Sequence, residues 1–157
     1  MSKRYAASTE VSAEKSRAEI ETTLRRYGAD QFIYGWQEGS AVIGFRAKGR
    51  QIKFILPQPK QDEKRFTHSS RGMRSPEVAR SAWEQACRQS WRALALVIKA
   101  KLEAVEAGIT CFEDEFLAHI ILPNGQPVGQ WFRPQLALAY EQGAMPPLLP
   151  APEGNRQ

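Results

Sequence analysis

The chain has 157 residues, of which 42% are hydrophobic and 25% are charged. This length fits one domain with a substantial core, and the composition excludes an intrinsically disordered chain. No stretch approaches 20 consecutive apolar residues, so we expect no membrane span. The first residues lack the apolar run of a signal peptide, and two cysteines are too few for a disulfide framework. These features favour a reducing, cytoplasmic setting.

The net charge is +5 at pH 7, from 22 Lys or Arg and 17 Asp or Glu. An excess of this size keeps a small protein soluble, and it also attracts a polyanion where the cations are clustered. Both interpretations stay open, and the positions of the basic residues along the chain decide between them.

A flexible tail is expected over residues 1–11 and a helix over residues 12–27. Ser16 and Glu19 have the spacing of a capping box near the helix start, and Gly28 suits its end. The helix has one modest apolar edge, which predicts packing on one side.

Three segments, at residues 31–37, 41–47 and 50–56, alternate apolar with polar or small residues and predict β-strands. The short turns EGS and KG join them, so we expect an antiparallel meander. Pairing across these turns collects the large apolar side chains on one face. That face consists of Phe32, Tyr34, Trp36, Ile43, Phe45, Ile52, Phe54 and Leu56.

The opposite face of the predicted sheet is lightly packed, and its charged residues are all basic. Two glycines on it leave the backbone approachable, and two cations stand on adjacent strands. Since phosphate contacts require clustered cations, we expect this face and its turn to contact a phosphate backbone. The expected contact residues are Arg46, Lys48, Arg50 and Lys53.

Residues 57–74 show no apolar period and contain five Lys or Arg against two acidic residues. Loops of this length inside a compact domain are usually functional or disordered. We expect a mobile basic loop, and two interpretations stay open: an arm that closes over phosphates, or an ordinary solvated loop. In the first interpretation the contacts come from Lys60, Lys64, Arg65 and Arg71.

A helix of some thirty residues is predicted over 75–107, with Ser75 as its cap and Gly108 after its end. Its apolar residues recur in steps of three and four, which predicts a buried seam that includes Trp83 and Trp91. We interpret both tryptophans as core residues rather than platforms for base stacking. Three cations lie beside the seam and either contact phosphates or cover apolar surface with their stems: Arg88, Arg92 and Lys99.

The remaining elements are short. A helix capped by Thr110, a hairpin that turns at Asn124-Gly125 and a last helix over 133–143 complete the predicted domain. Residues 144–157 are rich in proline and are expected to form an extended tail. The fold class is therefore α+β: one domain over residues 12–143, in which a three-stranded antiparallel meander packs on the long helix.

No catalytic or metal-binding signature is evident. His68, His119, Cys87 and Cys111 are scattered and form no paired ligand motif. The acidic run at residues 113–115 is explained more simply by a helix start than by Mg²⁺ binding. We therefore expect no cofactor, no metal and no enzymatic activity.

Three runs resemble a widespread family of small uncharacterised proteins of tailed phages and prophages, often encoded among genes of DNA metabolism. They are EKSRAEIETTLRRYGAD, AVIGFRAKGRQIKFILPQP and WRALALVIKAKLEAVEAGITCFEDEFLAHIILPNG. The resemblance implies a protein that acts in the host cytoplasm during infection, and it carries no catalytic residues. A weaker likeness, in the order of elements alone, is to Rad52-like single-strand annealing proteins, which use a basic groove.

The leading expectation is an accessory nucleic-acid-binding protein that tolerates many sequences, with single- or double-stranded DNA as its partner. Two alternatives stay open. One is an inhibitor that binds a host protein, as anti-CRISPR proteins do, although such inhibitors usually present acids and this chain has a basic excess. The other is an assembly protein, and a homo-oligomer is compatible with each of these functions.

Overall fold

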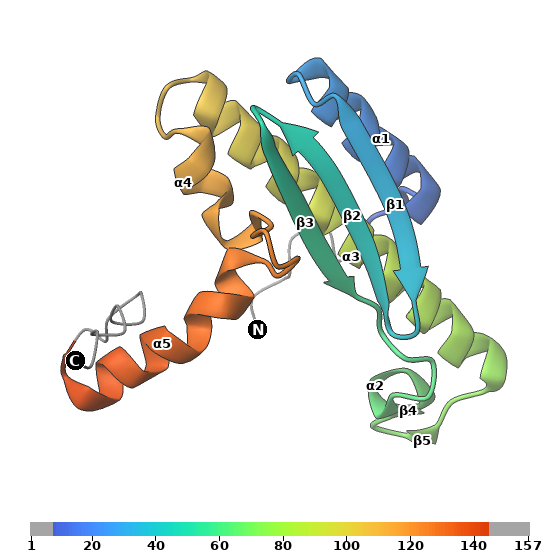
Figure 1. The fold of residues 1–157 in the computed structure, drawn as a ribbon. Coiled ribbons are helices and arrows are strands. Elements are labelled where there is room, and N and C mark those ends of the chain that lie inside the picture. The colour runs from blue at the N-terminus through green and yellow to red at the C-terminus, as the bar shows by residue number, and fades with distance from the viewer. Residues whose placement is uncertain (1–7, 145–157) are drawn as a thin grey trace, which may run out of the picture.

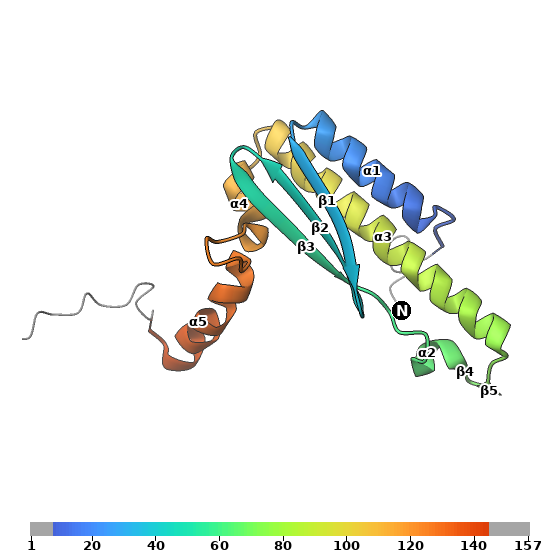
Figure 2. The same ribbon diagram turned by 45° about the vertical axis from the view of Figure 1, so that its right-hand side comes forward.

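The expected α+β architecture is confirmed. A computed structural model describes residues 8–144; all but the first residue of the expected tail over 144–157, and the first seven residues of the expected tail over 1–11, lie outside them. The first helix, α1 (Ala13–Arg26), precedes the three-stranded meander, and the long helix α3 (Pro76–Glu106) follows it. Both helices lie on the same side of the sheet, which leaves its other face open (Figures 1 and 2).

The strands are β1 (Gln31–Gln37), β2 (Ser40–Ala47) and β3 (Arg50–Pro57), and β2 is central. Their register is the one that the turns predict: Phe45 pairs with both Phe32 and Ile52. The predicted apolar face points toward the helices, and its buried members include Ile43, Phe45, Ile52 and Phe54. Trp36 shares this register but is 79% exposed, because the helices do not cover that end of β1.

The long helix supplies the other half of the core. Ser75 accepts a hydrogen bond from the backbone N–H of Val78, as expected of its cap. Trp91 is buried and its ring lies 5.8 Å from that of Tyr34, whereas Trp83, at the outer end of the helix, is half-buried. The buried part of the seam consists of Trp91, Leu94, Ile98 and Leu102.

Two predicted helix caps are wrong. The hydroxyl of Ser12, rather than that of Ser16, caps α1 by accepting from the backbone N–H of Lys15. Ser16 lies one turn inside the helix and is buried. The short helix α4 (Phe112–Phe116) follows Cys111 without a side-chain cap, because the hydroxyl of Thr110 points to a neighbouring carbonyl.

The predicted C-terminal hairpin is present, but it is held by a single β-bridge, between Ile121 and Pro127, rather than by paired strands. After the 3₁₀ turn η1 (Leu117–His119), residue Ile120 forms a bridge with Ile52 at the edge of the sheet. The chain turns at Asn124-Gly125 and enters α5 (Val128–Gln142), which begins earlier than predicted and continues through Pro134. No helix among residues 8–144 is long and apolar enough to cross a membrane.

The sheet register yields a test by stability. Phe45→Ala and Phe54→Ala should each reduce the free energy of unfolding by roughly 3–5 kcal/mol, because each deletes a buried ring. Gln51 lies on the open face and is exposed, so Gln51→Ala should change it by less than about 0.5 kcal/mol. Urea denaturation measures all three. Equal losses at Phe45 and Gln51 would contradict the register.

A second test uses His119, which is half-buried and stacks on Phe54 with ring centroids 4.0 Å apart. Burial lowers its pKa, the Lys101 ammonium lowers it further, and a hydrogen bond with the Lys53 backbone opposes these effects. The unfolded chain therefore binds the proton more readily. Stability should be fully present above the unfolded pKa of about 6.5 and should fall as the pH drops toward the folded value.

We expect the free energy of unfolding to decrease from about pH 7.5 to about pH 5.5, which lies above the range where carboxylates titrate. His119→Phe keeps an aromatic ring beside Phe54 and should flatten this dependence. An identical pH profile in the variant would show that His119 is not its source.

Candidate nucleic-acid interface

Residues 57–74, expected to be a loop, contain short elements of their own. They form the helix α2 (Lys64–Thr67) and a two-residue hairpin of β4 (His68–Ser69) and β5 (Gly72–Met73). Phe66 is buried and anchors α2 against α3. No sequence pattern predicts these elements, because the segment contributes a single large apolar residue to the core rather than a periodic set.

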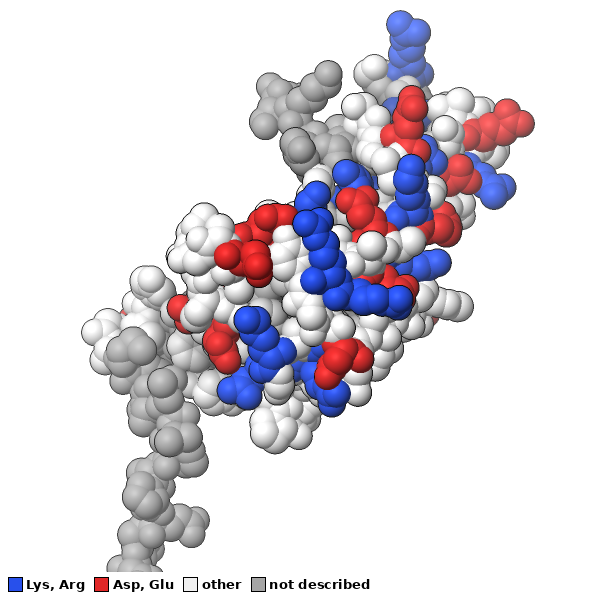
Figure 3. Space-filling view, turned by 90° about the horizontal axis from the view of Figure 1, so that it is seen from above, with Lys and Arg blue, Asp and Glu red and all other residues white. Residues whose placement is uncertain are grey.

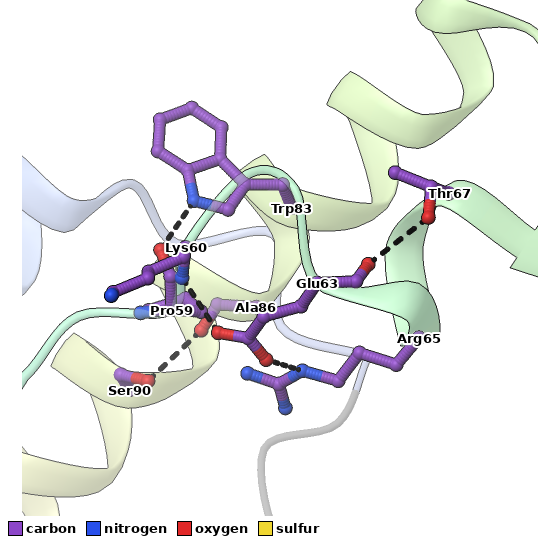
Figure 4. A network of polar contacts seen from close by, with 8 residues as sticks. All are labelled: Pro59, Lys60, Glu63, Arg65, Thr67, Trp83, Ala86 and Ser90. Atoms are coloured by element: carbon purple, nitrogen blue, oxygen red, sulfur yellow. Dashed lines mark hydrogen bonds and ion pairs between the residues drawn. The ribbon is translucent and has the colours of Figure 1, made fainter.

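One polar contact fixes the same segment to the long helix, and others order the segment internally (Figure 4). The indole N–H of Trp83 donates to the Pro59 carbonyl oxygen at 2.7 Å. The Glu63 carboxylate accepts from the backbone N–H of Lys60 at 2.6 Å and from Arg65 Nε at 2.7 Å. These two contacts, the backbone N–H first, lower the pKa of Glu63. The Lys and Arg residues of this segment are therefore held on a folded backbone rather than on a loose loop.

This part of the molecule carries most of the excess positive charge. We call residues 60–92 the basic lobe, which comprises the folded segment and the first half of α3. It contains eight Lys or Arg and four Asp or Glu, which gives it a net charge of +4, compared with +5 for the whole chain. Lys60, Lys64 and Arg71 are exposed and make no ion pair within 4 Å with any residue that the structure describes. Arg74 and Arg80 also belong to the lobe and were not predicted as contacts.

The β2–β3 turn is less basic than the sequence suggests. Arg46 donates to both carboxylate oxygens of Asp30, at 2.8 and 2.7 Å, and this hydrogen bonding lowers the pKa of Asp30. Arg50 lies 3.9 Å from Glu113, at the start of the acidic helix α4. Lys48, at the tip of the turn, forms no ion pair within 4 Å in the described part of the chain. Two of the three turn cations thus already face carboxylates.

The predicted contact residues do not form one surface. The β2–β3 turn and the basic lobe lie at opposite ends of the molecule, separated by the length of β3, roughly 26 Å. Figure 3, seen from the turn end, shows acidic side chains interspersed among the basic ones. The helix cations divide as well: Arg92 pairs with Glu19 of α1, while Arg88 contacts Gln85 within the lobe. Lys99 is exposed nearer the other end of α3.

The open face of the sheet is more apolar than cationic. Ile33 is 66% exposed and Ile55 is 50% exposed, with Gly35, Val42 and Gly44 between them in the register. Lys53 is half-buried among these residues. The small residues and basic charges expected on this face are present, and the exposed side chains of Ile33 and Ile55 add an apolar surface to them.

Two features of the described residues bear on the chemistry that the chain could perform. Within residues 8–144, no group of His, Cys, Asp and Glu could hold a metal ion. Burial raises the pKa of the Cys87 thiol, and the Glu84 charge adds to this, so Cys87 is a poor nucleophile. No match to the chain was found among protein-family models, curated proteins or solved structures. The function is therefore inferred from the geometry.

The anchoring of the lobe is testable by proteolysis. Trp83→Phe keeps an aromatic ring but removes the hydrogen bond to Pro59, so the segment should open more often. Trypsin should then cut faster after Lys60, Lys64 or Arg65, with little change in overall unfolding. Trp91→Phe, in the buried part of the seam, serves as the matched control. Unchanged cleavage in Trp83→Phe would contradict the anchoring role.

Proposed function

We propose that this protein is a sequence-tolerant nucleic-acid-binding protein, acting in the cytoplasm as an accessory factor rather than as an enzyme, and that the basic lobe is its contact surface. The observation that carries the proposal is the group of exposed cations on one folded support that have no carboxylate partner among residues 8–144: Lys60, Lys64 and Arg71. Such cations release counterions from a phosphate backbone on binding.

The shape of the lobe supports phosphate contacts rather than base readout. Its cations lie on a four-residue helix, a tight hairpin and one side of a long helix, so they follow an extended surface. The aromatic residues of the lobe, Phe66, Trp83 and Trp91, are buried or half-buried and offer no exposed stacking platform. Affinity would come mainly from charge, which makes binding tolerant of sequence and sensitive to salt.

The proposal predicts how binding depends on salt. In fluorescence anisotropy with labelled DNA, each lost phosphate contact should reduce the slope of log K against log salt by about 0.9 for duplex and about 0.7 for single strands. The triple variant Lys60→Ala, Lys64→Ala and Arg71→Ala should therefore flatten the slope by up to about 2.7 with duplex DNA and weaken unrelated sequences equally.

The matched control removes the same charge elsewhere. Lys48→Ala, Lys53→Ala and Lys99→Ala lie outside the lobe and should leave most of the salt dependence in place. Equal flattening by both triple variants would show that net charge, rather than the lobe, drives binding. Wild-type protein without salt-sensitive binding to DNA or RNA would overturn the proposal and favour a protein-binding function.

A further inference from the structure

The last helix has almost no packing partner among residues 8–144. Helix α5 contacts the rest of the described molecule at its first turn, where Gly129 lies close to Ala118, and then extends away from the domain (Figures 1 and 2). None of its residues is buried. Its exposed apolar residues are Trp131, Leu136, Leu138 and Tyr140, and Tyr140 is 84% exposed.

A helix of this kind needs cover from a tertiary contact. It has 15 residues, a length at which isolated helices are marginal in water. Pro134, in its interior, removes one backbone hydrogen bond and lowers its intrinsic stability further. Its apolar residues span a wide arc of the helix surface, which is the pattern of a helix that packs against another surface.

The open face of the sheet is a second apolar surface that no described residue covers. Ile33 and Ile55 stand on either side of central strand residues that are small. A hollow of about 220 Å³, lined by Ile33, Val42, Gly44 and Ile121 among others, lies on this face. A cavity of about 150 Å³ accepts a benzene ring, so the hollow has room for one aromatic side chain such as that of Tyr140.

We propose that the protein forms a two-fold symmetric dimer in which each subunit places α5 on the open sheet face of the other. A second copy is the partner favoured by area. On the scale of about 150–250 Å² for one fully buried aromatic side chain, the exposed fractions of the four α5 residues correspond to on the order of 400 Å², and those of Ile33 and Ile55 to on the order of 200 Å². Covering both patches in both subunits buries roughly 1,200 Å², at the lower limit of stable interfaces.

The same reckoning disfavours simpler arrangements. A pair of α5 helices packed only on each other would bury about 800 Å², less than reciprocal exchange, and would leave both sheet faces uncovered. In the reciprocal exchange, a single two-fold axis covers both the α5 patch and the sheet face of each subunit. The basic lobe lies at the far end of β3 and takes no part in the exchange.

Sedimentation equilibrium over a wide concentration range tests the dimer. Wild-type protein should be dimeric at micromolar concentration. Ile33→Lys on the sheet face and Leu136→Lys on α5 should each be monomeric. Ile109→Lys, at a position 80% exposed in the loop after α3, is the matched control and should remain dimeric. Circular dichroism should show that all three variants keep the folded domain.

Mixing the two monomeric variants distinguishes exchange from other contacts. In a mixed dimer the intact α5 of Ile33→Lys meets the intact sheet face of Leu136→Lys, so one of the two contacts is restored and dimers should reappear with reduced affinity. A mixture that stays monomeric, or an Ile33→Lys variant that stays dimeric, would overturn the exchange. A wild-type monomer at all concentrations would overturn the dimer and assign both patches to a different protein.

Discussion

The packing of α3 on one face of the three-stranded sheet determines the rest of the structure. Ile43, Phe45, Ile52 and Phe54 meet the seam of the long helix, and α1 closes the side of this core. Because both helices lie on the same face, the opposite face receives no cover from the described chain. The first half of α3 extends beyond this contact and becomes the support on which residues 57–74 fold.

The sequence predicted the core well because the core is periodic. A period of two in the strands and steps of three and four in the long helix specify register and seam without further information. The segment at 57–74 has no such period, and its order depends on single contacts over a distance, such as Trp83 with Pro59 and the burial of Phe66. Contacts of that kind leave no local pattern in a sequence.

The candidate site was predicted in part for the same reason. The sequence identifies the eleven basic residues proposed as contacts, but it does not show which of them form ion pairs with carboxylates. Those ion pairs decide which cations remain available to a phosphate. Arg46 with Asp30 and Arg92 with Glu19 join residues that are 16 and 73 positions apart in the chain. Most of the cations available for phosphate contacts therefore lie in the basic lobe rather than at the β2–β3 turn. The basic lobe is also separate from the apolar surfaces of the sheet and α5.

The central claim is that nucleic acid contacts the basic lobe and not the sheet. Hydrogen–deuterium exchange of the protein, measured with and without a DNA oligonucleotide at low salt, tests it most directly. The account predicts slower exchange in residues 60–74 and in the first turns of α3, with no change around Lys48 and Lys53. Slower exchange at the β2–β3 turn with an unaffected lobe would contradict it.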